Sequence, residues 1–558
     1  MSAAEAEQKA EEEAVKGGEL LFCGTTSWDA IGRRKVSPEG NLVSPTRLRP
    51  LVGVDIRFVA SGCASTHCVA LDVEGRCYTW GRNEARRAFD KGQLGHGDQI
   101  QRDRPTVVSE LSKYRIVRAG SGRSHTVVLT EDGITLSFGW NKHGQLGTGS
   151  VKNELELSPV RCLVSEVTNA VCGADFTVWL TTVEGASILT AGLPQYGQLG
   201  HGTDNEYNTK DSSVRLAYEA QPRPKAIASL AGETIVKIAC GANHTVAVDS
   251  NGYVYTWGFG GYGRLGHREQ KDEWAPRRVD VFTKHNLVPP DAVVSAGSAN
   301  SACTAGGGQL YMWGKIKNTG DDWMYPKPLM DLRLWSIPLC TFVAFYSCDS
   351  ELLKYFNFGW HLSCMDSGSM HHFVGADSSC ISWGHAQSGE LGYGPAGQKS
   401  SAVPKKVEIL DGMHVISVAC GLAHSMVIVD RTNGADQLDQ LDVYDGKAFG
   451  EGSEEPNGNT RVAKTTAKRG AAKTSENSKR KAKDSSESED EQDSEDGSDD
   501  SEEQVNGRAE KKKPRGGKAS GSGRGRGRGR GRPPVEKKGS ESAQGRGKVA
   551  KRGRPKKS

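Results

Sequence analysis

The sequence lacks the features that mark a secreted or membrane-spanning protein. Its thirteen cysteines are scattered singly between Cys23 and Cys420, without a C-x-x-C pair or the spacing of a zinc site. This pattern indicates reduced thiols in an intracellular protein. No stretch reaches about 18 uninterrupted apolar residues, and residues 1–18 are rich in Ala, Glu and Lys. We therefore expect neither a transmembrane helix nor a signal peptide, and no membrane association.

Motifs of the common enzyme classes are also missing. The sequence contains no G-x-x-x-x-G-K-[ST] phosphate loop, no G-x-S-x-G turn and no H-E-x-x-H pair. The segment from Gly258 to Gly263 matches the dinucleotide motif G-x-G-x-x-G, but the turn sequence RLGH follows it where that motif requires a helix. We expect no hydrolytic or redox active site, no metal site and no cofactor.

Aromatic residues stop at Phe449, and the charge changes near the same point. Residues 451–558 contain 29 Lys and Arg against 19 Asp and Glu, which leaves a net charge of −6 on residues 1–450. A segment without aromatic residues and with this much charge cannot bury a core. The chain is therefore expected to have a disordered N-terminus at 1–18, a folded body at 19–435, a disordered acidic linker at 436–507 and a disordered basic tail at 508–558.

A repeated pair organises the body: a glycine that follows an aromatic residue in five copies, Cys23 in the first and Ala191 in the fourth. It precedes a glycine-rich turn such as GQLGHG, and its glycine recurs at spacings of 57, 58, 53, 66, 56 and 70 residues. The seven marker glycines are Gly24, Gly81, Gly139, Gly192, Gly258, Gly314 and Gly384. Each unit holds short β-branched runs separated by D-G, E-G or N-G turns, which are typical of antiparallel hairpins. Seven units of this length predict an all-β, seven-bladed β-propeller.

A second block of the form Gly-x-x-His lies between successive markers. Its histidines are His125, His244, His371 and His424, and His67 lies at the equivalent point of a relaxed copy that begins at Ala64. Because they recur at equivalent positions in different units, they indicate a turn-stabilising hydrogen bond in each of those blades, not a shared metal cluster.

These blocks together resemble the repeats of the regulator of chromosome condensation family, over roughly residues 19–430. The string WGFGGYGRLGHREQKDE from Trp257 to Glu273 is similar to the second vertebrate branch of that family more than to the Ran exchange factor. The resemblance implies a monomeric nuclear scaffold for chromosome or cell-division regulation, on chromatin, in the nucleolus or on the spindle. It also leaves open guanine-nucleotide exchange on a small GTPase of Rac, Arf or Ral type, with microtubule association as a further implication.

Three segments exceed the repeat: residues 85–90, 205–231 and 336–361. The second is expected to be either a binding loop or a polar connector. The third is strongly apolar, and we attribute it to a disordered bulge or to an error in assembling the coding sequence. The candidate partner-binding residues lie in the second segment and in the hairpin after Trp257; they are Arg215, Tyr218, Arg223, Phe259, Tyr262 and Arg264.

The tail carries two sequences that resemble AT-hooks, RGRGRPP and KRGRPKK. In such a motif the glycine lets the backbone lie in a narrow A·T minor groove while both arginines enter its negative potential. The candidate DNA-binding residues are Arg530, Gly531, Arg532 and Pro533, with Arg552, Gly553, Arg554 and Pro555. The alternative is a polybasic tail that binds any nucleic acid by charge alone.

Overall fold

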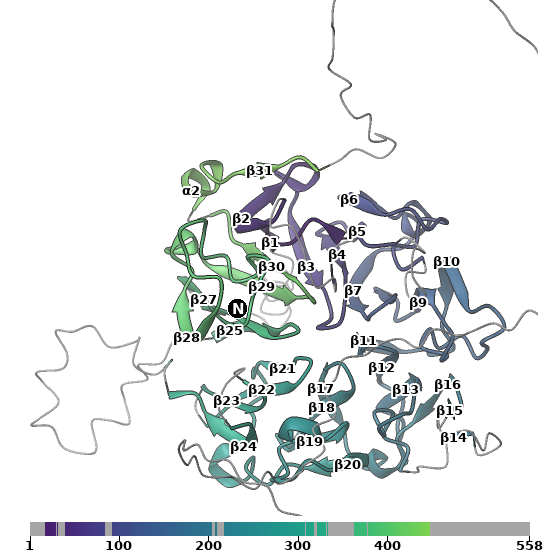
Figure 1. Ribbon diagram of the computed structural model, residues 1–558. Helices are drawn as coiled ribbons and strands as arrows, with labels where there is room; N and C mark the ends of the chain where they lie inside the picture. Colours follow the sequence, from purple (N-terminus) through teal and green to yellow (C-terminus); the bar gives the residue numbers. More distant parts are fainter. Residues whose placement is uncertain are drawn as a thin grey trace, which may run out of the picture. The chain divides into compact units, whose positions relative to one another are not determined.

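The protein forms a ring of seven β-sheets around a central axis (Figure 1). The structure is a computed structural model that describes residues 17–28, 31, 40–83, 92–202, 207–208, 217–306, 308–316, 321–330, 332, 362–376, 378–432 and 434–446. In each of these seven sheets four strands pair antiparallel, from an inner strand beside the axis to an outer strand at the rim. The seven-bladed propeller expected from the repeats is thus confirmed.

The first four blades follow the chain in order. From the inner strand outward, blade 1 is β3 (Ile56–Ala60), β4 (His67–Asp72), β5 (Cys77–Gly81) and β6 (Arg102–Val107); blade 2 is β7 (Ile116–Ser121), β8 (His125–Thr130), β9 (Thr135–Trp140) and β10 (Leu155–Arg161); blade 3 is β11 (Val167–Cys172), β12 (Phe176–Thr181), β13 (Ile188–Gly192) and β16 (Gln221–Ala226); blade 4 is β17 (Ile235–Cys240), β18 (His244–Asp249), β19 (Val254–Gly258) and β20 (Glu273–Arg278).

The last blade joins the two ends of the described chain. Blade 5 is β21 (Val294–Ala296), β22 (Asn300–Ala305), β23 (Gln309–Gly314) and β24 (Trp323–Pro328); blade 6 is β25 (Leu362–Ser367), β26 (His371–Ala376), β27 (Ser379–Gly384) and β28 (Ser401–Lys406); blade 7 is β29 (Val415–Cys420), β30 (His424–Val429), β1 (Glu19–Gly24) and β2 (Leu42–Leu48). Because β1 pairs with β30 along its whole length, the ring is closed by backbone hydrogen bonds between sequence-distant strands.

The marker glycines lie at the end of the third strand of every blade. All seven have positive φ, between 95° and 126°, a region that residues with a Cβ rarely adopt. Each lies opposite the first residue of the second strand, as Gly81 lies opposite His67. At Gly258, a Cβ would lie 2.5 Å from the carbonyl oxygen of Asn243. The repeat needs glycine here because the chain turns sharply against its neighbour.

Seven hydrophobic clusters form the core, and each draws its residues from two consecutive blades. Trp80 of blade 1 shares a cluster with Met426 of blade 7, and Trp257 of blade 4 shares one with Phe176 of blade 3. Trp313 and Trp383 occupy the same position in the next two clusters. The aromatic residue before the marker glycine therefore packs between blades, as expected, and each blade depends on its neighbour for burial.

Every outer strand contains a proline at an irregular point of its pairing. The pairing of the third and outer strands shifts register in all seven blades. The equivalent proline of each shift is, in turn, Pro45, Pro105, Pro159, Pro224, Pro276, Pro326 and Pro404. Proline has no N–H to offer a further strand, and a bulge bends an edge away from straight pairing. The prolines thus protect the rim from edge-to-edge association.

Two expected boundaries need correction. Residues 221–231 belong to blade 3, since β16 is its outer strand and Ala228–Leu230 forms a short 3-10 turn that buries Leu230. The excess is therefore shorter than 205–231, and its described part is a hairpin of β14 (Tyr207–Asn208) and β15 (Ala217–Tyr218). The segments 85–90 and 336–361 lie outside the described residues.

The folded body also continues beyond residue 435, the boundary expected from composition. Helix α2 (Ala435–Asp439) and strand β31 (Val443–Tyr444) follow blade 7, and β31 pairs in parallel with the outer strand β2. We call residues 435–446 the strap. Leu438 of the strap is 3% exposed and belongs to the core cluster between blades 6 and 7. Residues 436–446 of the expected linker therefore belong to the folded body, and residues 447–507 lie outside the described residues.

Candidate protein-interaction site

The repeated histidines link neighbouring blades, which the expectation of a bond within each turn did not include; His67 also makes the expected turn contact, with Nδ1 3.0 Å from Ser65 Oγ. The Nε2 atom of His67 lies 2.8 Å from Thr126 Oγ1 of the next blade, and that hydroxyl donates to the carbonyl of Gln93. Because the hydroxyl hydrogen is used there, Nε2–H of His67 is the donor to Thr126. His125, His244 and His371 contact Thr177, Ser301 and Ser425 in the same way.

Burial keeps these histidines neutral. Loss of hydration lowers the pKa of His67 to about 3 and that of His125 to about 4. The glycine of Gly-x-x-His is required because the imidazole ring lies over it: a Cβ on Gly241 would lie 2.1 Å from Cε1 of His244. The described residues contain no group of three or more His, Cys, Asp or Glu placed to hold a metal ion. The motif therefore serves the fold.

The hairpin between β19 and β20 of blade 4 presents the aromatic residues singled out in the sequence. It carries two residues other than glycine with positive φ, Tyr262 at 61° and Arg268 at 68°. Such conformations cost roughly 1 kcal/mol or more and often occur at binding sites. The turn is held by Asp272, whose Oδ1 accepts a hydrogen bond of 2.8 Å from the amide of Gly260. Partial burial raises the pKa of this carboxyl group.

Arg264 supports this hairpin from below. Its side chain is fully buried, at 1% exposure, and Nε donates to the carbonyl of Gly261 at 2.9 Å. A second guanidinium nitrogen donates to the carbonyl of Ser298 in blade 5. The guanidinium also lies 4.5 Å from the ring centre of Phe259 and 5.4 Å from that of Tyr262. Arg264 thus positions the two aromatic rings, and a direct contact between its charge and a partner stays a prediction.

The accessible part of this site is a patch of half-buried side chains from three blades, which we call the aromatic patch: Tyr196, Phe259, Tyr262 and Lys315. The rings of Tyr196 and Phe259 are 4.6 Å apart, and Lys315 Nζ lies 4.9 Å from the ring centre of Tyr262. Sequence reasoning missed Tyr196 and Lys315. Tyr196 was recognisable, because YGQLG in blade 3 repeats the YGRLG that contains Tyr262.

The other nominated partner-binding residues do not gather here. Tyr218 lies in the β14–β15 hairpin. Arg223 lies on the outer strand of blade 3, where it is exposed and its Cγ approaches Gly149 of blade 2. Arg215 lies outside the described residues, as do all eight candidate DNA-binding residues of the tail. Their roles stay predictions.

Within the described part of the chain, no helix is long and apolar enough to cross a membrane. Comparison with known proteins places the propeller. The model of the RCC1-like domain matches residues 14–321, and that of the regulator of chromosome condensation (RCC1) repeat matches residues 377–428. The chain belongs to the regulator of chromosome condensation family.

Individual relatives agree with this assignment. The chain is 36% identical to human protein RCC2 over 434 residues, which cover 74% of this chain and 76% of that protein. Among solved structures, human WBSCR16 has a TM-score of 0.58 at 20% identity and covers 74% of this chain and 99% of its own. Prp20p from Saccharomyces cerevisiae has a TM-score of 0.55 at 18% identity, and the match covers 77% of this chain and 96% of that chain. The two structures support the fold, and the identity to RCC2 supports the expected branch of the family.

Proposed function

We propose that this family member is a nuclear interaction scaffold, whose propeller binds proteins and whose basic tail holds it on chromatin. The observation that carries the proposal is the separation of charge within a regulator of chromosome condensation protein. Residues 1–450 have a net charge of −6, whereas residues 508–558 contain 20 Lys and Arg against three acidic residues. A negatively charged body is repelled by DNA, so the tail is the part suited to bind it.

Two features of the propeller support a role in protein binding. The aromatic patch combines three rings with a lysine on one face, and Tyr and Trp rings are common centres of protein interfaces. Tyr262 is held there in a strained conformation by a buried arginine, so the exposed geometry is fixed before a partner arrives. The described residues offer no metal cluster to suggest different chemistry.

The chromatin tether is tested with the C-terminal Arg-Gly-Arg-Pro. In a chain with Arg530 and Arg532 replaced by serine, Arg552→Lys with Arg554→Lys keeps the charge but replaces the flat guanidinium by a strongly hydrated ammonium. We expect weaker binding to an A·T-rich duplex and loss of its preference over a G·C-rich duplex at fixed salt. The matched control, Lys537→Arg with Lys538→Arg, should change neither. If the chain that keeps Arg552 and Arg554 bound both duplexes equally, minor-groove recognition would be excluded and the tail would bind DNA by charge alone.

A second candidate function is nucleotide exchange on a small GTPase. The structure of Prp20p was reported together with its binding properties to Gsp1p and histones. Exchange needs a surface that displaces parts of the GTPase and no proton-transfer residue, so the absence of catalytic motifs in the sequence does not argue against it. Release of a fluorescent nucleotide from Rac-, Arf- and Ral-type GTPases is the test. If the aromatic patch is used, Lys315→Glu should slow release and Lys142→Glu, in the equivalent hairpin of blade 2, should not.

A further inference from the structure

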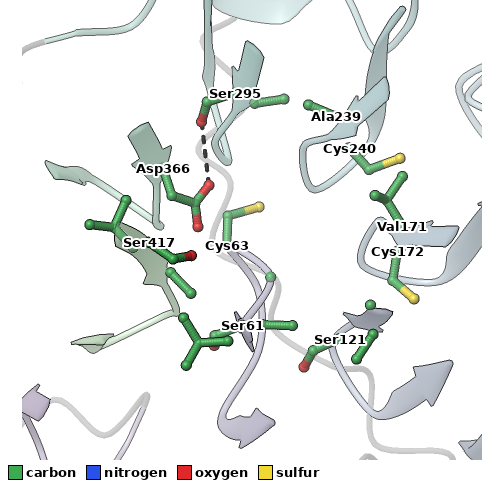
Figure 2. Close-up of a pocket in the computed structure, with 18 of the residues that line it drawn as sticks. Ser61, Cys63, Ser121, Val171, Cys172, Ala239, Cys240, Ser295, Asp366 and Ser417 are labelled. Atoms are coloured by element: carbon green, nitrogen blue, oxygen red, sulfur yellow. Dashed lines mark hydrogen bonds between the residues drawn. The ribbon is translucent and has the colours of Figure 1, made fainter. Parts of the chain in front are cut away.

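A cavity of about 270 Å³ lies on the axis of the propeller. Inner strands of all seven blades wall it, and Figure 2 shows their side chains surrounding an open space. Blade 1 contributes an additional residue, Cys63, because its turn from Ser61 to His67 is two residues longer than the turn from Ser121 to His125. This turn lies close against blade 2, since a Cβ on Gly62 would be 2.1 Å from the carbonyl oxygen of Ser121.

One residue of the wall, Asp366 of blade 6, has a carboxyl group. The strand pairing gives its counterparts in the other blades as Ala60, Gly120, Val171, Ala239, Ser295 and Ala419. All six are small or apolar and uncharged. Six blades therefore form without a carboxylate at this position, so the blade geometry does not require one.

The carboxylate is held in place but has no counter-ion in the wall. Oδ2 accepts a hydrogen bond of 2.8 Å from the amide of Cys420, and Oδ1 accepts one of 3.3 Å from Ser295 Oγ (Figure 2). None of the residues that line the cavity is Lys, Arg or His. Burial raises the pKa of Asp366 to about 7. A cation placed beside it would therefore be stabilised by a charge that the protein leaves unbalanced.

The remaining wall is weakly polar. Cys63, Cys172 and Cys240 line it together with Ser61, Ser121 and Ser417. Burial raises the pKa of Cys63 to about 11 and that of Cys172 to about 12, so both thiols are neutral at physiological pH. Neutral thiols pack like small apolar groups. The cavity thus has one carboxyl group in a wall that is otherwise made of uncharged thiol, hydroxyl and apolar groups.

We propose that this central cavity binds a small organic cation, a protonated alkyl amine, with its ammonium group at Asp366 and its alkyl chain against the thiol wall. A metal ion fits less well, because a single carboxylate is too few ligands and the described residues contain no metal-binding group of three. The volume is at the lower end of that of ligand pockets, which favours an amine of a few carbons. This inference is independent of the scaffold function and of the tail.

The test measures binding to the full chain by titration calorimetry in phosphate buffer. The probes are n-butylammonium and, as the uncharged analogue, n-butanol. At pH 8 we expect saturable binding of the amine and none of the alcohol. Asp366→Asn should weaken amine binding at least tenfold, whereas Asp291→Asn, the same change at an exposed carboxylate outside the cavity wall, should keep it. Equal binding by wild type and Asp366→Asn, or equal binding of amine and alcohol, would overturn the proposal.

A pH series on the wild-type protein gives a second measurement that does not depend on a variant folding. Between pH 8 and pH 5 Asp366 gains its proton while butylammonium stays charged, so affinity should fall about tenfold or more. The groups facing Asp366 are the thiols of Cys63, Cys364 and Cys420, all with pKa values raised by burial, and none of them titrates in this range. Constant affinity from pH 8 to pH 5 would count against a role for the carboxylate.

Discussion

At the residue scale, the most informative motifs of the sequence consist of residues that form contacts between neighbouring blades. Gly-x-x-His was recognisable as a repeat, but its partner hydroxyls, such as Thr126 for His67, lie a whole repeat away in the sequence. Spacing within one repeat cannot reveal a bond to the next, so the histidine appeared to serve its own turn. Blade 3 has Phe176 at the equivalent position, where hydrophobic packing replaces this bond, and blade 5 has Asn300.

The buried histidines predict a loss of stability in mild acid. The folded-state pKa values of His67 and His424 are lowered to about 3, below the value of about 6.5 in the unfolded chain. Between pH 6.5 and 4 the unfolded chain therefore binds more protons, and the free energy of unfolding decreases as the pH falls. Urea unfolding at pH 7, 5.5 and 4.5 measures the effect.

A glutamine variant separates this effect from general acid sensitivity. His67→Gln should be less stable than wild type at pH 7 but should lose less stability between pH 7 and pH 4.5. His385→Gln changes an exposed ring and serves as the control, with the pH dependence of wild type expected. If His67→Gln and wild type showed parallel pH curves, the histidine would not be the titrating group.

At the scale of elements, the strands and their order were predictable, whereas the strap was not. The aromatic-Gly and Gly-x-x-His blocks each mark one strand end, so their copies locate most of the blades. Residues 435–446 contain four Asp, which placed them with the acidic segment that follows, although Leu438, Leu441, Val443 and Tyr444 are typical of the body. Their order comes from tertiary contacts: Arg47 Nη1 binds Asp439 Oδ1 at 3.0 Å, and the amide of Arg47 donates to the carbonyl of Asp442 at 2.9 Å.

The strap predicts unequal effects for the two partners of its main ion pair. The side chain of Arg47 is only 10% exposed and also donates to the carbonyls of Asp439 and Leu441, whereas the side chain of Asp439 is 81% exposed. Arg47→Ala removes several partly buried hydrogen bonds and should cost about 2 kcal/mol. Asp439→Ala removes one exposed charge and should cost less than about 0.5 kcal/mol.

Chemical unfolding together with limited proteolysis measures both changes. Arg47→Ala should also make the peptide bonds near α2 accessible to protease before the ring unfolds, because the strap is then released. Equal losses of stability in the two variants would mean that the exposed ion pair, and not the buried guanidinium, holds the strap.

At the scale of the whole molecule, stability depends on joining the ends of the ring. The repeats predicted seven units but not which strands the N-terminal unit completes, because the weak first copy, LLFCG, contains only part of the pattern. In the structure β1 enters the blade of β29 and β30, and the contact is reinforced by Arg431, whose Nη2 lies 2.7 Å from Glu19 Oε2. The tail and the long insertions have no repeat pattern, so for them sequence reasoning is limited to composition.

This closure gives the last prediction, which concerns Arg431. The side chain of Glu19 is 5% exposed, and Arg431 also donates to the carbonyl of Val54 at 2.7 Å. Arg431→Ala leaves a buried carboxylate without its counter-ion and should destabilise the whole ring by roughly 3 kcal/mol, with a single unfolding transition because the blades unfold together. Adding Glu19→Gln removes the unbalanced charge and should restore part of the loss. Calorimetry of the two variants decides the matter: an unchanged melting temperature in Arg431→Ala, or no recovery in the double variant, would show that β-strand pairing alone closes the ring.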